Sequence, residues 1–502
     1  MDFYSVLHVA GFTFIQAACS TLLALIIGLP AAFFCARRKF FGRRFLLSLS
    51  AVPFCIPSLL IALGYVTFLG LNGTLNQFLM TVFGLEKPPV TFLYSFAGLI
   101  IAHGFYNFAL IMKNVSDVWE KLPSECAESA RLLGAGEFRI FRTVTFRQLL
   151  PAVSSSCMLV FIYCFLSFVL VLLFGGIGNS TLEVEIYKAA RASMNFKQAF
   201  LLSAFETFIL CLMVMFYFFL QQKKSASSGI QDNMKNARLP LSGKTEYAGF
   251  VFLMVVTGVF FIFPLLGIAF NAFTSSAHGS EGSFTLDSFV RIFRMKSFIP
   301  SVKSTIYLGC CTAALSVAAG FTYSLFLRFN ERKGYRKLNA FLNVAPMIPM
   351  CVSSVVLGLI FIMTVKRGNP FHLILAQTFM FWPVSFRVIY PQLMRISDAT
   401  VDQAMLLSRN VLDTAVRVIL PVSRKSLLTA FGFAFAMSAG DTGLPLVMGI
   451  SDFTTLSLFT YRLAGAYRFN EACASGVILG LLSGGILVLG MILSRKRLKE
   501  KR

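Results

Sequence analysis

Charged residues are scarce in this sequence. Asp, Glu, Lys and Arg make up 13% of its 502 residues, whereas soluble domains carry roughly 25%. Acidic residues number only 22, while hydrophobic residues reach 57% and the mean hydropathy is +0.75. This balance excludes an ordinary soluble domain and predicts a protein that crosses a membrane several times.

Residues that form metal, disulfide or nucleotide sites are also few. The chain has four histidines and eleven scattered cysteines, of which Cys310 and Cys311 form the only close pair. Without a CxxC or His-Cys cluster, the sequence predicts neither disulfides nor a metal site. Gly243-Lys244-Thr245 resembles the end of a phosphate-binding P-loop, but the first glycine of that motif would be Arg238. We therefore expect no cofactor on this chain, and the absence of clustered catalytic side chains argues against a membrane-embedded enzyme.

Eleven segments are long and apolar enough to cross a membrane, which takes about 20 residues in a helix. They lie near residues 12–36, 45–69, 92–112, 150–174, 199–220, 247–272, 303–327, 338–364, 371–390, 426–448 and 471–494. The first is too long for a signal peptide and lacks a clear cleavage site. The predicted fold class is an all-α polytopic membrane protein with about eleven transmembrane helices.

The basic residues predict the orientation of these spans. Of the 45 Lys and Arg residues, 33 lie in six alternate polar segments. These segments are 37–44, 113–149, 221–246, 328–337, 387–425 and 495–502. Because Lys and Arg accumulate on the cytoplasmic side, this bias places the N-terminus outside and the C-terminus in the cytoplasm. Nucleic-acid binding is disfavoured, since the net charge of +23 is dispersed over six loops.

Two parts of the chain repeat each other. A shift of 274 residues aligns the loop after the third span with the loop after the ninth. It pairs Glu128, Ala130, Gly134 and Val144 with Asp402, Ala404, Ser408 and Val418, and Leu132-Leu133 with Leu406-Leu407. The frame extends to 99–105 upstream and 175–188 downstream, and a shift of 292 aligns Pro57 with Pro349. The sequence thus predicts two parallel halves, related by an axis along the membrane normal.

The predicted division follows from this repeat. Residues 1–220 form a first half with five spans, 221–246 a cytoplasmic linker, 247–494 a second half with six spans, and 495–502 a basic tail. The first half is one helix shorter than the second.

The first repeated loop has the pattern of a short helix, a sharp turn and a second amphipathic helix. Pro123-Ser124 supplies a stop and an N-cap, and Glu125 and Glu128 fall in the first turn, where the helix dipole favours negative charge. Ala130 and Leu133 lie on a small apolar face, and Gly134-x-Gly136 permits a tight turn. A single such loop is as well explained by a helix lying on lipid headgroups. Two copies on one side favour docking to grooves of a cytoplasmic partner.

These loops resemble the EAA loop of ABC importer permeases, written E-A-A-x3-G-x9-I-x-L-P. The first copy keeps Glu128, Ala130 and Gly134 but has Phe146-Arg147 where Leu-Pro is expected. The second keeps Ala404, Leu420 and Pro421 but has Asp402, Gln403 and Ser408. Losing the glycine at 408 raises the cost of a positive-φ turn, so we expect the two loops to differ in their contacts.

The resemblance implies the type I ABC importer permease fold and a set of partners. It implies two copies of a cytoplasmic ABC ATPase, which carry ATP and Mg²⁺, and an extracytoplasmic solute-binding protein. The ATPase contacts would be made by Glu125, Glu128, Ala130, Leu133, Gly134, Asp402, Ala404, Leu407, Ser408 and Pro421. The chain itself would not be an enzyme, and it would lie in a bacterial inner membrane.

Three stretches resemble the thiamine transporter permeases in particular. They are LIIAHGFYNFALIMKNV (99–115), residues 173–191 and residues 438–468. The expected substrate is thiamine or its phosphates, and ferric iron or another small solute is the alternative. That family begins with an additional span, which is missing before the first span here.

Asp441 is the most unusual residue within the predicted spans. A carboxylate at the centre of a span costs roughly 2.5–3.5 kcal/mol on insertion scales, so a functional role is the default hypothesis. With Gly440, Pro57 and Pro349 it is a candidate for the translocation path; alternatively, it satisfies the backbone at a kink. His103 and Glu206 favour interhelical hydrogen bonding over substrate contact. An ion-coupled secondary transporter is disfavoured, because these charges are few and are not duplicated by the repeat.

Overall fold

A computed structural model describes most of the chain. The described residues are 3–51, 56–123, 125–174, 180–227, 238–274, 284–332, 334, 338–339, 342–365 and 368–496. The predicted N-cap Ser124, Gly175 of the repeat alignment, the centre of the linker and most of the basic tail lie outside them.

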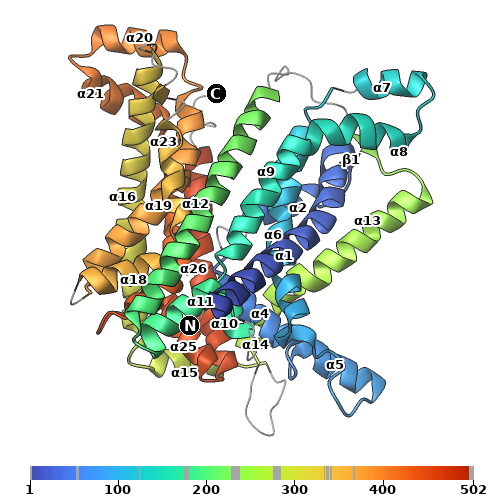
Figure 1. Cartoon of the computed structure of the whole chain (residues 1–502), viewed down its shortest axis with the longest axis vertical. Helices are drawn as coiled ribbons and strands as arrows, with labels where there is room; N and C mark the ends of the chain where they lie inside the picture. The colour runs from blue at the N-terminus through green and yellow to red at the C-terminus, as the bar shows by residue number, and fades with distance from the viewer. Residues whose placement is uncertain are drawn as a thin grey trace. The chain divides into compact units, whose positions relative to one another are not determined.

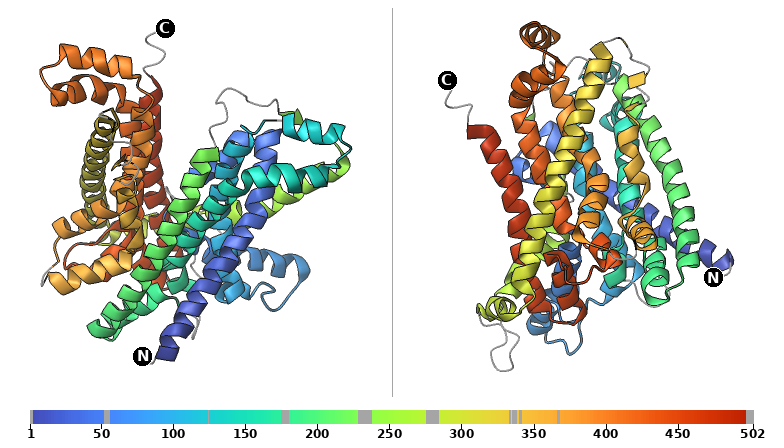
Figure 2. Two further views of the ribbon diagram at one scale, coloured as in Figure 1. Left: turned by 45° about the horizontal axis from the view of Figure 1, so that its top comes forward. Right: turned by 90° about the vertical axis from the view of Figure 1, so that its left-hand side faces the viewer.

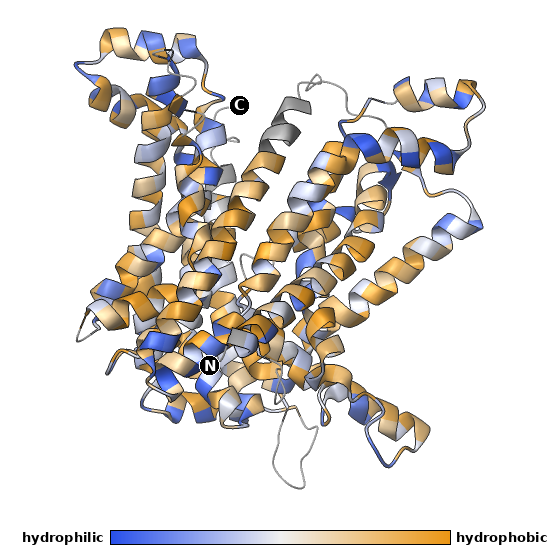
Figure 3. Ribbon diagram, in the orientation of Figure 1, coloured by the Kyte–Doolittle hydropathy of each residue, from blue (hydrophilic) through white to orange (hydrophobic). Residues whose placement is uncertain are grey.

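Long apolar helices account for most of the described chain (Figure 1), as the composition predicts. By length and composition, nine described helices can cross a membrane, or eleven if each of two bent helix pairs counts as one span. The nine are Tyr4–Arg37, Ser58–Phe83, Phe96–Trp119, Glu137–Phe165, Phe196–Leu220, Lys244–Ala272, Phe298–Arg332, Pro370–Leu393 and Phe469–Gly490. The bent pairs are Ala345–Cys351 with Ser354–Thr364 and Val411–Val422 with Arg424–Gly440. The predicted fold class is confirmed, and Figure 3 shows apolar residues along these helices.

Elements up to the linker have the following bounds: α1 (Phe3–Arg37), β1 (Arg38–Lys39), α2 (Arg43–Ser48), η1 (Leu49–Ala51), α4 (Ser58–Leu69), α5 (Thr74–Phe83), η2 (Phe92–Tyr94), α6 (Phe96–Trp119), α7 (Glu125–Leu132), α8 (Glu137–Ile140), η3 (Phe141–Thr145), α9 (Phe146–Phe165), α10 (Val169–Phe174), α11 (Leu182–Tyr187), η4 (Lys188–Ala192) and α12 (Phe196–Ser227).

Elements after the linker continue the series: β2 (Leu239–Pro240), α13 (Lys244–Thr257), η5 (Gly258–Ile262), α14 (Phe263–Ala272), α15 (Asp287–Arg294), α16 (Phe298–Arg332), η6 (Ala345–Cys351), α18 (Ser354–Thr364), α19 (Pro370–Leu393), α20 (Asp398–Leu407), α21 (Val411–Thr414), η7 (Ala415–Ile419), α22 (Leu420–Val422), α23 (Arg424–Gly440), α24 (Gly443–Met448), α25 (Leu456–Gly465) and α26 (Phe469–Lys496).

The chain forms two compact units that are not continuous in sequence. Unit 1 contains residues 1–53, 64–185 and 208–267, and unit 2 contains 54–63, 186–207 and 268–502. In unit 1, α1, α6 and α9 pack against one another; in unit 2, α16, α19 and α23 do the same. The division at 220 and 247 describes the sequence repeat and stays a prediction.

Several local features recur at the repeat distance. The π-helical segments η3 and η7 lie 274 residues apart. Gly42 and Gly334, 292 residues apart, both adopt a left-handed backbone with φ of 86° and 84°, which glycine tolerates without steric cost. In unit 1 the hydroxyl of Thr13 accepts a hydrogen bond from the amide of Leu182 at 3.1 Å. In unit 2 the hydroxyl of Thr305 accepts one from Leu456 at 2.7 Å. These recurrences support the two-half interpretation.

One predicted span differs from the structure in detail. The predicted span 150–174 is interrupted, because α9 ends at Phe165 and α10 begins only at Val169. The second amphipathic helix of the first loop leads into the next span, as the sequence predicts, since α8 continues through η3 into α9. Hydropathy averages over such interruptions, and a π-helical turn leaves little trace in the sequence.

Candidate coupling loops and translocation path

The first repeated loop forms the exposed helix α7. Glu125 and Glu128 lie in its first turn, where negative charge interacts favourably with the helix dipole. Both side chains are exposed, and Ala130 is half-buried. The helix ends in Leu132 and Leu133, which are 89% and 88% exposed. It is unusual for two adjacent leucines of a polar segment to stay exposed, because burying each side chain is favourable by roughly 1.5–3 kcal/mol.

The second loop forms α20, with a similar exposed end. Ser397 caps the helix by accepting a hydrogen bond from the amide of Thr400 at 3.2 Å. Ala404 is buried and Asp402 is exposed. Leu406 and Leu407, the equivalents of Leu132 and Leu133, are 86% and 91% exposed. Figure 1 and the left view of Figure 2 show α20 and α21 at one end of α16.

The turns after the two helices differ. Gly134 adopts φ of +81°, as its glycine predicts. Ser408 instead has an extended backbone with φ of −102° and ψ of 147°, and its hydroxyl donates to the carbonyl of Ala404 at 2.6 Å. The second loop therefore avoids the positive-φ conformation that would be costly for serine, and Asn410 caps the following helix α21.

Pro421 coincides with a second difference between the loops. A proline has no N–H to donate to the preceding helical turn, and the helix from 411 to 422 meets α23 at an angle of 76°. In the first copy, Arg147 occupies the equivalent position and the helix runs without a break from Glu137 to Phe165. The first copy thus turns at a glycine, whereas the second bends next to its proline.

Ion pairs anchor the two loops to different helices. In the first loop, Arg131 donates to Glu137 at 2.6 Å, and this hydrogen bond raises the pKa of the Arg131 guanidinium. In the second, Arg328 at the end of α16 is buried and donates to Asp398 at 3.2 Å and to the carbonyl of Ile396 at 2.5 Å. Arg332, one turn further on, pairs with Asp402. The pairing of Asp402 with α16 has no signal in the sequence, because it depends on tertiary placement.

The path candidates Gly440 and Pro57 are neighbours. Gly440 ends α23, and a Cβ atom there would lie 2.9 Å from Cγ of Pro57. Asp441 follows at the interruption before α24. Its carboxylate accepts hydrogen bonds from Gln377 at 3.0 Å and from the amide of Leu444 at 3.3 Å. The end of α23 therefore packs against the residue that precedes α4.

Pro349 lies elsewhere in unit 2. It is buried in η6, where it lines a groove of about 560 Å³ with side chains of α16 and α19. The other lining residues are mainly apolar and aromatic: Ala319, Thr322, Tyr323, Phe326, Ala345, Ile348, Phe379 and Trp382. Pro57 and Pro349 correspond in the repeat but have different surroundings.

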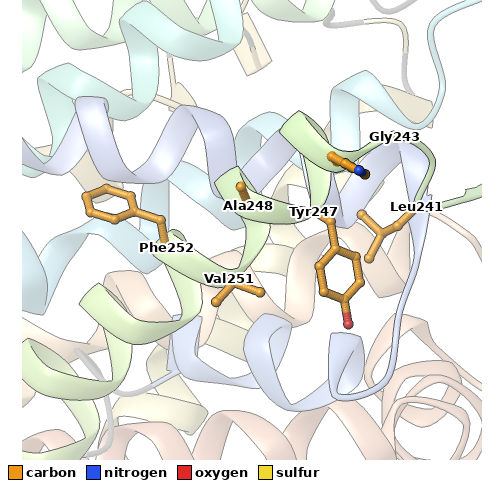
Figure 4. A pocket seen from close by; sticks show the side chains of 7 residues that line it. Leu241, Gly243, Tyr247, Ala248, Val251 and Phe252 are labelled. Atoms are coloured by element: carbon orange, nitrogen blue, oxygen red, sulfur yellow. The ribbon is translucent and has the colours of Figure 1, made fainter.

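A second groove, of about 780 Å³, runs along the start of α13 in unit 1 (Figure 4). Gly243 and Lys244 line it together with Leu241, Tyr247, Ala248, Val251 and Phe252. Nearby, β1 and β2 pair in parallel, and salt bridges join Arg38 to Glu246 and Arg238 to Glu120. The end of the linker is thereby fastened to α1 and α6. In the described part of the chain, no group of three or more His, Cys, Asp or Glu side chains could hold a metal ion.

Comparison with known proteins defines the class. Residues 24–225 match the family described as binding-protein-dependent transport system inner membrane component. The helices, the repeat and this match make the chain a permease subunit of an ABC importer with two halves in one polypeptide. Subunits of this class are not enzymes themselves; the family implies separate ATPase and binding-protein partners and a multi-pass location in the inner membrane.

The relatives that match nearly the whole chain are thiamine transport system permease proteins, named ThiP. The one from Brucella abortus (strain 2308) is 26% identical over 98% of this chain and 88% of its own length. Those from Haemophilus influenzae and Escherichia coli (strain K12) are 26% and 25% identical over 95% of this chain and 87% of theirs. A solved structure of a bacterial ABC transporter involved in the import of the acidic polysaccharide alginate has a TM-score of 0.40 at 16% identity, over 50% of this chain and 94% of that one.

Proposed function

We propose that this chain forms the membrane path of an ATP-driven importer of thiamine or thiamine phosphates. An extracytoplasmic binding protein delivers the substrate, and two copies of a cytoplasmic ATPase dock on α7 and α20. Closure of the ATPases on ATP draws the two docking helices together and alternates access to the path. The N-terminus lies outside and the C-terminus in the cytoplasm, which puts both docking helices on the cytoplasmic side.

The exposed leucine pairs carry the coupling part of the proposal. Leu132-Leu133 and Leu406-Leu407 occupy equivalent positions of the repeat, and each of the four is at least 86% exposed. Water disfavours such apolar surface, so a protein partner that covers it gains affinity. The acidic first turn of α7 and the exposed Asp402 supply polar contacts around the leucines.

The substrate part rests on the relatives named as thiamine transport permeases, which match 95–98% of this chain. Ferric iron or another small solute is the alternative within the same architecture.

Substrate competition tests this assignment. Cells that lack their own thiamine uptake would produce the chain with its ATPase and binding protein, and uptake of radiolabelled thiamine would be measured. We expect uptake that excess unlabelled thiamine or thiamine phosphates abolish and that ferric citrate leaves unchanged. Uptake of labelled iron but not of thiamine would overturn the substrate assignment and leave the permease class intact.

A further inference from the structure

The same polar contact occurs at a helix interruption in each half. In unit 1, Nε2 of His103 on α6 lies 2.6 Å from the hydroxyl of Ser167, between α9 and α10. In unit 2, Nε2 of Gln377 on α19 donates to the carboxylate of Asp441 at 3.0 Å, between α23 and α24. The partners are 64 residues apart in each pair, and the repeat shift of 274 carries one pair onto the other.

Each pair also contacts a third helix, α1 in unit 1 and α16 in unit 2. In unit 1, Nδ1 of His103 lies 2.9 Å from the amide nitrogen of Gln16, which also donates to Ser20 at 3.1 Å. In unit 2, the side-chain oxygen of Gln377 accepts from Thr312 on α16 at 3.4 Å. Ser20 and Thr312 correspond at the shift of 292. Each network thus joins three helices around one interruption.

An interrupted helix within a membrane leaves backbone groups without partners, and neighbouring side chains must satisfy them. Asp441 does so directly, since one carboxylate oxygen accepts from the amide of Leu444 while the other holds Gln377. A further hydroxyl, that of Ser457, donates to the backbone carbonyl of Asp441 at 2.8 Å. The carboxylate is therefore committed to backbone and amide partners of its own unit.

We propose that the pairs His103–Ser167 and Gln377–Asp441 are equivalent hinge clasps, and that Asp441 is a positioning residue rather than a ligand of the substrate. Each clasp holds the start of the short helix after the interruption, α10 or α24, against another span of the same unit, α6 or α19. This inference rests on the proposed function, because the motion that the clasps restrain is that of a transport cycle. The two clasps differ in strength, since a hydrogen bond to a carboxylate is roughly twice as strong as a neutral one. The His103–Ser167 hydrogen bond of unit 1 is accordingly weaker than the Gln377–Asp441 hydrogen bond of unit 2.

Exchanging the chemistry of the clasps tests the inference. The variants are D441S and Q377H alone and the double variant Q377H/D441S, which rebuilds the His–Ser pair of the first half in the second. Uptake would be measured with the complete transporter. We expect each single variant to shift the unfolding equilibrium by about tenfold or more, as one lost hydrogen bond to a charged group implies, and to lower the maximal rate of uptake. The double variant recovers most of that loss, and KM for the loaded binding protein stays unchanged throughout.

The competing role for Asp441 gives a different pattern. If its carboxylate met a cationic substrate, Q377H/D441S would be as inactive as D441S, and such a result would overturn the clasp. Thermal unfolding of the purified chain supplies a readout that needs no transport. The single variants should lower the melting temperature and the double variant restore it, whether or not thiamine is the substrate. Equal melting temperatures for all variants would also contradict the clasp.

Discussion

Replacing Leu133 and Leu407 by alanine should weaken binding of the ATPase without destabilising the chain. The two side chains are 88% and 91% exposed, so they contribute almost nothing to the packing of the permease itself. If docking buries them fully, each loses roughly 1.5–3 kcal/mol of favourable burial on truncation. Since 1.4 kcal/mol is a factor of ten, each substitution should weaken binding at its own loop by about 10-fold to 150-fold.

The assay is a titration of the purified ATPase onto the detergent-solubilised chain, with the dissociation constant read from surface-immobilised permease. Leu481→Ala is the matched control, because Leu481 is 70% exposed in α26 and far in sequence from either loop. Wild-type affinity for L133A and L407A would refute the docking argument. If lipid covers these leucines instead, the two variants would change the chain's association with lipid vesicles and leave ATPase binding as it was.

Two further predictions concern contacts within unit 2. Gly440→Val should lower the melting temperature, because the new side chain meets Pro57 and overpacking costs about 1–3 kcal/mol. Gly484→Val is the control and should have little effect, since no atom lies within 4 Å of the added Cβ. Equal melting temperatures for the two variants would contradict the close approach of Gly440 to Pro57. Arg328→Ala should destabilise the chain by about 1–3 kcal/mol, because it leaves the Ile396 carbonyl without its donor. Arg332→Ala should cost less than about 1 kcal/mol, because its ion pair with Asp402 is exposed. Denaturant unfolding monitored by circular dichroism measures both losses, and a larger loss for Arg332→Ala would contradict this order.

Span number and the repeat could be predicted from sequence because they depend on length, hydropathy and periodicity. Eleven predicted spans correspond to nine helices and two bent pairs. The exact interruptions could not be predicted, since α9 ends at Phe165 within an unbroken apolar stretch. The contact between His103 and Ser167 lies at that position, and it joins residues 64 apart.

The candidate site also contains residues that the sequence predicts and residues that it does not. The loop residues were predicted because a pattern of residues recurs, and the structure places most of them in or directly after α7 and α20. Their differences were harder to predict, because Ser408 escapes a positive φ only through a change in the following turn. Gln377 had no signal of its own, since it is uncharged and its role follows from Asp441. Gly440 and Pro57 are adjacent only through the tertiary fold.

The most direct test of the account is transport by the reconstituted system. Proteoliposomes would contain the chain with its ATPase, with ATP inside and binding protein loaded with radiolabelled thiamine outside. We expect accumulation that requires both ATP and the binding protein and that the double variant L133A/L407A abolishes. Accumulation driven by a proton gradient in the absence of ATP and of the ATPase would contradict it.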